Sequence, residues 1–446
     1  MRFASRIAAC SFAALLAACG GGGGTVTPPP AGNLPSVVTI SPAGSPSAVA
    51  YRIGGSGSWT SASTSTTTQF TVPVGTTTYS VAYACNGTYE TDQTVMNLGV
   101  TDTLTVPASC YLGPGCGCAV PSGPARVFGT FDATAVGATS VLVSATYDQA
   151  DVSVASGAGS FSNLVTDTVS QTFVLAAKNA AGDVVGFKSL HGMTPPPFTI
   201  PLALNFPPLT AADAAVSEPF TVTGGIGSSR QFGVAYLLDG TNNGFEVTNA
   251  SGTSYAGVPA ADWGTSDSYG VFVKSFDSAG NDYFGTFHLG RTTATAPVAV
   301  TLPALSHIAI NHADLSFPLT YNGFSASDVA KGYVYAEFDG STPPEYDVAT
   351  PAYLAGKTSY GPPSFAGQTG FVTKTAANVT WAQYAVVGLS FQPSSTATGY
   401  LGGYPPAGQS VEAYLSIYAP GSVPGSAPLR LRLMKGDRVP VGILQP

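Results

Sequence analysis

The sequence predicts an all-β protein built from about four tandem β-sandwich domains, and three observations support this prediction. Its 446 residues include 53 Gly and 35 Pro, which favour turns, together with abundant Val, Thr, Tyr and Phe, which favour strands. A weak internal repeat recurs at roughly 100 residues, a spacing too long for solenoid repeats or propeller blades. Prolines lie at the seams between the copies, as at Pro207 and Pro208.

Each copy of the repeat contains a strand, a turn rich in Gly, Asn or Asp, and a second strand, which is the pattern of a β-hairpin. The first strands of these hairpins are expected at residues 79–85, 173–178, 269–274 and 371–374. From the repeat and the prolines we place β-sandwich domains at 35–120, 124–208, 214–305 and 312–446, the last one elaborated. Helix is expected only as a short turn within 211–216.

The chain begins with a pattern typical of a secretory signal. Arg2 and Arg6 precede an apolar run over residues 7–18 that is too short to span a bilayer. The run ends in Leu16-Ala17-Ala18-Cys19, and this stretch resembles the lipobox of bacterial lipoproteins. The resemblance implies that residues 1–18 are a signal peptide that is removed. It also implies that Cys19 is thioether-linked to diacylglycerol and N-acylated, so that it carries fatty acids such as palmitate.

The residues after Cys19 bear on localisation and reach. Gly20 stands where similar lipoproteins of the inner membrane usually carry aspartate, so the resemblance implies anchoring in the outer membrane, facing the periplasm or the cell surface. Five glycines over 20–24 and three prolines over 28–30 predict a linker over 19–34, flexible first and stiffer near its end. Three acyl chains exceed the two membrane signals that stable anchoring needs.

Two other interpretations of this stretch remain open. Cleavage by an ordinary signal peptidase after Ala18 would leave Cys19 as a free N-terminal thiol. Cys10, which follows Ala8 and Ala9, also fits a looser lipobox, although almost no apolar run precedes it. The residues around Cys19 match the lipobox pattern better than those around Cys10.

Charge and motif content exclude several classes of function. The chain carries 16 Lys and Arg against 24 Asp and Glu, a formal net charge of −8, which argues against a nucleic-acid partner. It contains no His-Glu-x-x-His pair, no Gly-x-Ser-x-Gly elbow and no phosphate-binding glycine loop. We therefore expect a protein that is not an enzyme and needs no cofactor. His191 and His288 occupy similar places in the repeat and are interpreted as structural strand residues.

Four cysteines remain beyond the signal and Cys19. Period-two alternation places Cys85 on the apolar face of the strand that it ends, and it places Cys110 likewise. Both sulfurs should point into the core of the first domain, so an oxidising compartment predicts a Cys85–Cys110 disulfide. Cys116 and Cys118 flank one glycine in a Gly/Pro-rich seam and are the candidates for a second, local disulfide. No histidine lies near them in sequence to complete a metal site, and no metal is expected there.

Two further groups of residues are candidates for ligand binding. Asp277 and Asp282 flank a turn and offer carboxylates to calcium, but a calcium site takes six to eight oxygens, so turn formation explains them better. Trp59, Trp263 and Trp381 are candidates for stacking on sugars. They fall at different places within their repeats, which disfavours a shared platform.

In pattern alone, the tandem units resemble the immunoglobulin-like and fibronectin-type-III-like modules of bacterial surface proteins, and no motif of either family is matched. The combined expectation is a lipid-anchored cell-envelope protein that acts as a non-catalytic binding module or as a spacer and adhesion module. Its partners would be the membrane, through the anchor, and a protein or glycan ligand. A carbohydrate-binding surface lipoprotein and an accessory subunit of an envelope complex are the alternatives.

Overall fold

A computed structural model shows an all-β protein, which confirms the predicted fold class. The structure describes residues 36–88, 91–110, 125–146, 148–154, 156–197, 200–225, 229–241, 243–279, 282–303, 310–319, 326–390 and 404–418. Strands dominate these residues, and the α-helices α1 (Ala326–Lys331) and α2 (Pro351–Leu354) are each shorter than two turns. Within the described ranges, no helix has the length and apolarity that a membrane crossing requires.

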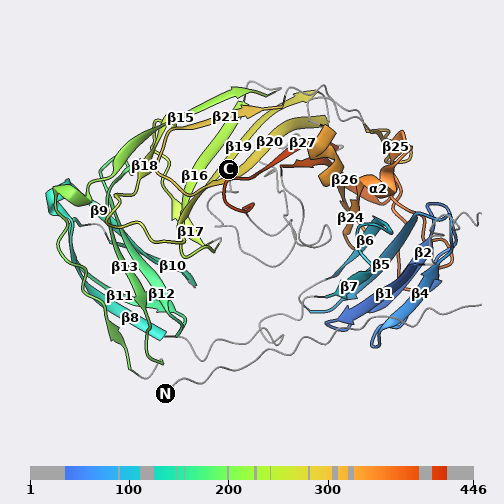
Figure 1. Ribbon diagram of the computed structural model, residues 1–446, viewed down its shortest axis with the longest axis horizontal. Coiled ribbons are helices and arrows are strands. Elements are labelled where there is room, and N and C mark those ends of the chain that lie inside the picture. Colours follow the sequence, from blue (N-terminus) through green and yellow to red (C-terminus); the bar gives the residue numbers. More distant parts are fainter. Residues whose placement is uncertain are drawn as a thin grey trace, which may run out of the picture. The chain divides into compact units, whose positions relative to one another are not determined.

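One strand order recurs along the chain. The first copy consists of β1 (Ser36–Ala43), β2 (Ala48–Ile53), β3 (Thr60–Ser61), β4 (Thr68–Val72), β5 (Thr78–Asn86), β6 (Thr91–Gly99) and β7 (Thr105–Ser109). These strands form a three-stranded layer, β4-β1-β7, and a four-stranded layer, β3-β2-β5-β6 (Figure 1). The first strand pairs antiparallel with the fourth and parallel with the seventh. Val38, Val81 and Val106 bring both layers into one core.

The second and third copies repeat this order strand for strand. The second copy consists of β8 (Ala125–Asp132), β9 (Ser140–Ala145), β10 (Asp148–Val154), β11 (Ala158–Thr166), β12 (Gln171–Lys178), β13 (Val184–Met193) and β14 (Leu202–Ala203). The third consists of β15 (Val216–Gly224), β16 (Ser229–Leu237), β17 (Gly244–Glu246), β18 (Ser254–Gly257), β19 (Ser268–Ala279), β20 (Asp282–Thr292) and β21 (Val298–Leu302). Their layers are β11-β8-β14 with β10-β9-β12-β13, and β18-β15-β21 with β17-β16-β19-β20. The expected ranges 124–208 and 214–305 therefore each contain one complete copy.

The fourth copy follows the same order as far as the structure describes it. It consists of β22 (Phe317–Pro318), β23 (Tyr333–Gly340), β24 (Glu345–Ala349), β25 (Ser359–Tyr360), β26 (Val379–Leu389) and β27 (Ser410–Tyr418), with β22 paired to β25 and the order β24-β23-β26-β27 in the other layer. Immunoglobulin domains instead place strands A, B, E and D in one sheet and C, F and G in the other. The likeness to immunoglobulin-like modules thus extends to the two-layer architecture and not to the strand order.

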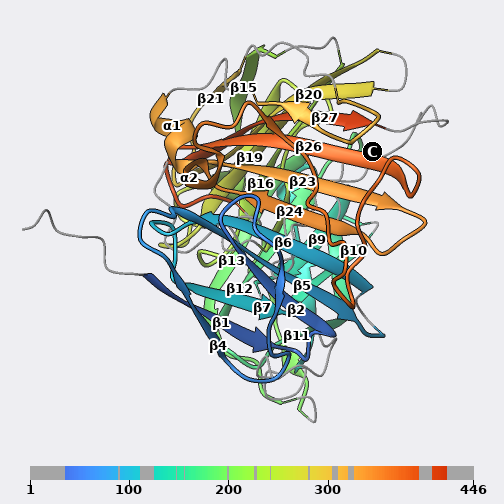
Figure 2. The ribbon, with the colours of Figure 1, turned by 90° about the vertical axis from the view of Figure 1, so that its right-hand side faces the viewer.

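The four-stranded layers of three copies join edge to edge into one twelve-stranded sheet, β17-β16-β19-β20-β27-β26-β23-β24-β6-β5-β2-β3. Strand β20 of the third copy pairs antiparallel with β27 of the fourth, and β24 of the fourth pairs parallel with β6 of the first. Figure 2 shows β26, β23, β24, β6 and β5 in succession along this sheet. Backbone hydrogen bonds therefore cross between the expected domain ranges, and the connecting segments are not the only links between copies.

The second copy joins the third through side chains instead. The central strand β12 of its four-stranded layer is buried on both faces: Leu175 lies with Val143 in the copy's own core, whereas Val174 lies with Phe187 in the core of the third copy. The Phe187 ring meets the Tyr236 ring edge-on, with centroids 6.0 Å apart. A strand with two buried faces needs a continuous apolar run rather than an alternating one, which explains the sequence Phe-Val-Leu-Ala-Ala over 173–177.

The hairpins expected from the repeat are confirmed in three copies, as β5–β6, β12–β13 and β19–β20. In the fourth copy the prediction is wrong, because residues 371–374 lie in a loop and β26 takes the place of the fifth strand. Phe371 stacks on Phe365 at 4.8 Å, and Phe365 stacks on Trp59 of the first copy. These apolar residues thus cover a neighbouring sheet face, and the sequence pattern alone does not distinguish that use from a strand.

The predicted disulfide is present in the first copy. Cys85 near the end of β5 and Cys110 directly after β7 are bonded, with Cα atoms 5.6 Å apart. Because β5 belongs to the four-stranded layer and β7 to the three-stranded layer, the bond joins the two layers. Cys85 is buried in the shared core, as the period-two argument requires.

Replacing both cysteines, Cys85→Ala with Cys110→Ala, should lower the free energy of unfolding of the first copy by about 3–4 kcal/mol, since the bond joins residues with a sequence separation of 25. Hydrogen exchange of the β1 and β7 amides measures this loss within the full chain. Val74→Ala, an exposed position in the same copy, is the control and should leave exchange unchanged. Equal exchange in the two variants would contradict a stabilising role.

Candidate functional site

For several residues singled out by the sequence, the expected roles remain predictions. Cys19, Cys116 and Cys118 fall outside the described residues, so lipid attachment and the second disulfide are not addressed by the structure. Asp277 is exposed in β19, and Asp282 begins β20, but the side chain of Asp282 is outside what is described. Among the described residues, no group of three or more His, Cys, Asp or Glu comes together as a metal site would require.

The three tryptophans do not come together. Trp59 is only 8% exposed, donates its ring N–H to the Ser364 carbonyl oxygen at 2.9 Å and contacts the Arg52 guanidinium. Trp263 packs between aromatic rings of the third copy, with Tyr269 at 5.0 Å. Trp381 is half-buried in β26. The burial of Trp59 speaks against a sugar platform there, and its ring instead ties the first copy to the fourth.

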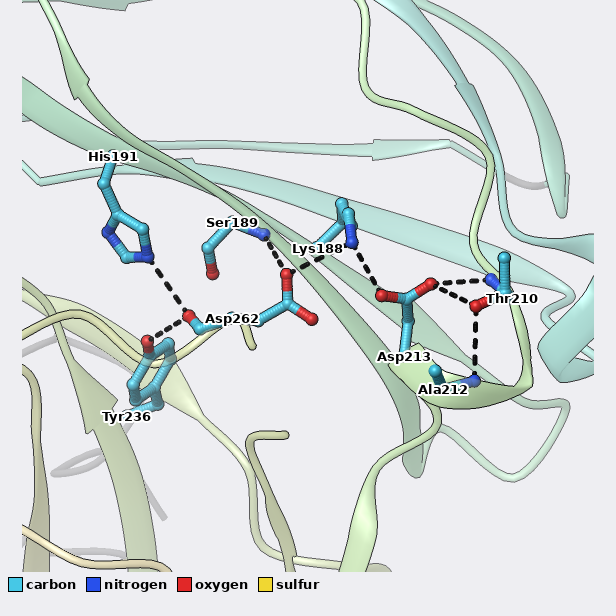
Figure 3. A network of polar contacts seen from close by, with 8 residues as sticks. All are labelled: Lys188, Ser189, His191, Thr210, Ala212, Asp213, Tyr236 and Asp262. Atoms are coloured by element: carbon cyan, nitrogen blue, oxygen red, sulfur yellow. Dashed lines mark hydrogen bonds and ion pairs between the residues drawn. The ribbon is translucent and has the colours of Figure 1, made fainter. Parts of the chain in front are cut away.

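A polar network between the second and third copies forms the first candidate site (Figure 3). Lys188 of β13 donates to the Asp213 carboxylate at 2.7 Å and forms an ion pair with Asp262 at 3.6 Å. Asp213 ends the short 3-10 turn η2 (Ala211–Asp213), which lies within the expected 211–216 stretch. Asp262 belongs to the loop between β18 and β19. We call Lys188, Asp213 and Asp262 the interlayer clamp.

Neighbouring hydrogen bonds hold each acidic member of the clamp. The Thr210 backbone N–H and hydroxyl donate to Asp213 at 2.7 and 2.9 Å, which forms a capping box around the 3-10 turn. The Ser189 N–H donates to Asp262 at 3.0 Å. His191 Nε2 lies 3.3 Å from the Asp262 carbonyl oxygen, and this contact is compatible with the structural role that the sequence predicts.

Electrostatics in the clamp follow from these contacts. Burial raises the pKa of Asp213, but the hydrogen bonds from Lys188 and Thr210 outweigh burial and leave that pKa below its ordinary value. Burial dominates at Asp262 and leaves its pKa raised. The hydrogen bond to Asp213 raises the pKa of Lys188, which keeps the ammonium charged. The Lys188 ammonium thus pairs with carboxylates on both sides of the junction between the two copies, which is the arrangement of a structural clamp.

A cleft beside His288 forms the second candidate site. On one face of the twelve-stranded sheet, His288 and Gly290 of β20 stand opposite Glu412 and Ser410 of β27. The small residues Gly290 and Ser410 leave this face hollow, and residues 296–300 form the facing wall. The resulting cleft has a volume of about 400 Å³, within the range of small-molecule sites.

The polar end of the cleft is organised by one histidine. His288 Nδ1 lies 2.6 Å from Glu412 Oε1, which orients the imidazole. A Cβ atom on Gly290 would lie 2.8 Å from His288 Nε2, so only glycine lets the ring lie over this strand. Gln409 lines the same cleft, and its buried Oε1 has no hydrogen-bond partner. The cleft therefore offers an oriented imidazole and an unsatisfied amide oxygen to a ligand.

The hydroxyl of Ser390 in the cleft is held by backbone hydrogen bonds. Ser390 Oγ accepts a hydrogen bond from the Ser410 N–H at 2.8 Å and donates to the Ser410 carbonyl oxygen at 3.2 Å. Its hydroxyl is thus occupied by backbone and is not activated by the imidazole, whereas nucleophilic catalysis needs a hydrogen bond from nucleophile to base. Ser390 and His288 therefore do not form a nucleophile–base pair in this structure.

Sequence reasoning did not find this cleft. The sequence pattern predicts a structural strand role for His288, whose partner Glu412 is 124 residues away in the chain. Only the edge pairing of β20 with β27 brings the two side chains together. No protein-family model and no curated protein matches this chain.

Changing Lys188 to Met should lower the free energy of unfolding around β13 by about 1–3 kcal/mol, because two largely buried carboxylates lose their cation. Hydrogen exchange of the β13 amides reports this change. Adding Asp262→Asn should recover part of the loss, since it removes one uncompensated charge. Lys178→Met on the neighbouring strand β12 is the matched control, and an equal effect there would contradict the clamp.

Proposed function

We propose that this protein is a lipid-anchored protein of the cell envelope that acts by binding and not by catalysis. The lipobox resemblance at Cys19 supports the anchor, and the cleft beside His288 supports the binding role. The observation that carries the binding role is the hollow face at Gly290 and Ser410, where an oriented imidazole meets a space of about 400 Å³. A spacer needs packed sandwiches but no such hollow.

A lipid anchor is compatible with ligand binding at the cleft. Acyl chains would hold the protein at the outer membrane, and the linker over 19–34 would let the folded copies turn relative to the lipid surface. A ligand in the cleft would contact β20, β27 and the 296–300 wall, which belong to the third and fourth copies. The spacer and adhesion role would then belong to the remaining copies.

A carbohydrate is the second candidate for the occupant. Sugar hydroxyls both donate and accept, so they match the Gln409 amide, the His288 imidazole and the Thr292 hydroxyl that line the cleft. The apolar residues Val298 and Val300 would face the sugar carbons. An envelope-complex subunit remains the other alternative, and co-purification from membranes distinguishes it.

Cys19→Ala should abolish incorporation of radiolabelled palmitate, because the thioether and the acylated amine both depend on this residue. Metabolic labelling of cells that express the full chain measures this directly. Cys10→Ala is the matched control and should label like the wild type. Equal labelling of wild type and Cys19→Ala would overturn the lipoprotein proposal.

Gly290→Val should abolish ligand binding at the cleft, because a Cβ at this position would displace the imidazole of His288. The measurement is binding of the detergent-solubilised full chain to an array of oligosaccharides, with His288→Ala as the second variant. Thr66→Ala, exposed in the first copy, is the control. Saccharide binding that survives both cleft variants would place the site elsewhere.

A further inference from the structure

The junction between β6 and β24 differs from every other strand pair of the described twelve-stranded sheet. It is parallel, whereas the remaining neighbours in this sheet run antiparallel. It also joins the first copy to the fourth, with Glu345 opposite Gln93 and Ala349 opposite Asn97. Parallel pairing is slightly less stable per residue, so side chains at this junction matter more than elsewhere.

Two carboxyl groups lie on one side of β24 at this junction. Glu345 and Asp347 are two residues apart, so they point to the same face of the sheet, and both are 0% exposed. A strand interior without water is an unfavourable place for one carboxylate and far more so for two. In the sequence this pair belongs to the segment Glu-Tyr-Asp, whose alternation of polar and aromatic residues is typical of an ordinary β-strand.

Gln93 binds Glu345 across the junction. Its side-chain N–H₂ donates to Glu345 Oε2 and to the Val372 carbonyl oxygen, the latter at 2.7 Å. Its side-chain carbonyl accepts from the Val372 N–H at 3.0 Å. The amide of Gln93 is therefore fully engaged, and one oxygen of Glu345 is satisfied from the first copy.

Tyr360 binds Asp347 in a similar way. Its hydroxyl donates to Asp347 Oδ2 at 2.9 Å and accepts from the Asn97 amide at 2.8 Å. Asn97 in turn accepts from the Ser80 hydroxyl at 2.7 Å. One buried hydrogen-bonded chain thus runs from Asp347 through the fourth copy into β6 and β5 of the first.

The other oxygen of each carboxyl group receives no hydrogen bond from a neighbouring donor, and the two carboxyl groups lie within hydrogen-bonding reach of each other. Glu345 Oε1 and Asp347 Oδ1 are buried without a hydrogen bond. The nearby cations do not supply one: Lys374 donates to the Thr342 hydroxyl at 2.9 Å and to the Pro343 carbonyl, and Arg52 donates to Ser80 and Tyr353. A proton on one carboxyl group would turn it from an acceptor into a donor, which the pair otherwise lacks.

The electrostatics agree with this geometry. Burial, followed by repulsion from Asp347, raises the pKa of Glu345 well above its ordinary value. Burial raises the pKa of Asp347 to about 7, although the hydrogen bond from Tyr360 opposes the shift. Lys374 opposes the rise in the pKa of both groups and Arg52 opposes it at Asp347, but burial outweighs both cations.

We propose that the parallel junction between β6 and β24 is a pH-sensitive latch, closed while Glu345 or Asp347 carries a proton and loosened once both are ionised. The folded junction holds more protons than the unfolded chain between the ordinary carboxyl range near 4 and about 7. Stability of the junction therefore falls as pH rises through that window, and it continues to fall until Glu345, whose pKa is also raised, has lost its proton. The latch would join the first and fourth copies more firmly in acid.

Other titratable groups face the pair and must be separated from it. Lys374 and Arg52 approach from the covering loop and from β2, and Tyr360 and Tyr384 approach from β25 and β26. The tyrosines stay protonated because burial raises the pKa of each above its already high value. His312 lies in the 311–316 turn near the Tyr384 side of this face, and His312→Asn is therefore included as a control.

Hydrogen exchange of the full chain in detergent micelles, followed from pH 5 to 8 and corrected for intrinsic exchange, tests the latch. Peptides that cover 93–97 and 345–349 should lose protection as pH rises, by up to about tenfold per pH unit for each carboxyl that titrates. Asp347→Asn or Glu345→Gln alone should flatten this dependence, and the double variant should remove it. The β8–β11 strand pair of the second copy, which contains no His, Glu or Cys, serves as the internal reference and should show no such slope.

Each outcome of this experiment either supports the latch or overturns it. A wild-type junction without a pH slope overturns the latch, and this result does not depend on any variant folding. The same slope in β8–β11 would mean a global titration and would overturn it as well. A slope that survives in the double variant, or that disappears in His312→Asn, assigns the effect to another group. A slope confined to the junction and lost with the two carboxyl groups supports the proposal.

Discussion

Edge-to-edge pairing of strands is the interaction on which the rest of this structure depends. In a lone sandwich of this order, the edge strands would leave backbone N–H and C=O groups unpaired. Unpaired groups are unfavourable where they are buried, and where they are exposed they favour aggregation. The pairs β20–β27 and β24–β6 remove four such edges. Three copies thereby share one hydrogen-bonded sheet, and the position of each copy follows from strand register.

The candidate sites exist because of this pairing. His288 meets Glu412 only since β20 and β27 are in register over the whole of their contact. Gln93 reaches Glu345 because β6 and β24 are neighbours. A shift of one residue would send these side chains to the opposite face of the sheet. The polar side chains at these two strand junctions therefore favour the observed register, because a shifted register would leave buried polar groups without hydrogen-bond partners.

Buried polar groups serve two different purposes in this protein. In the interlayer clamp, one lysine compensates two carboxylates, and most of the hydrogen bonds are made. At the β6–β24 junction, two carboxyl groups lie together and each keeps one oxygen without a partner. In the clamp a cation contacts both carboxylates, whereas at the junction the nearby Lys374 donates to other groups, so the second arrangement is the one that we expect to respond to protonation. In the cleft beside His288, a contact with Glu412 orients the imidazole, whereas the buried Gln409 amide oxygen in the cleft wall has no hydrogen-bond partner.

Local sequence determined the elements of this protein, and tertiary structure decided how they meet. The all-β class, three of the four repeat hairpins and the Cys85–Cys110 disulfide follow from composition, turn residues and period-two alternation, which act over a few residues. The loop use of Phe371 and the burial of Trp59 could not be predicted in this way, because an apolar residue that covers a neighbouring sheet resembles one that lies within a strand. The pairs His288–Glu412 and Gln93–Glu345 join residues 124 and 252 positions apart. Such contacts depend on which sheet edges pair, and that choice is made by backbone hydrogen bonds and side-chain packing between copies, which leave no periodic signal in the sequence.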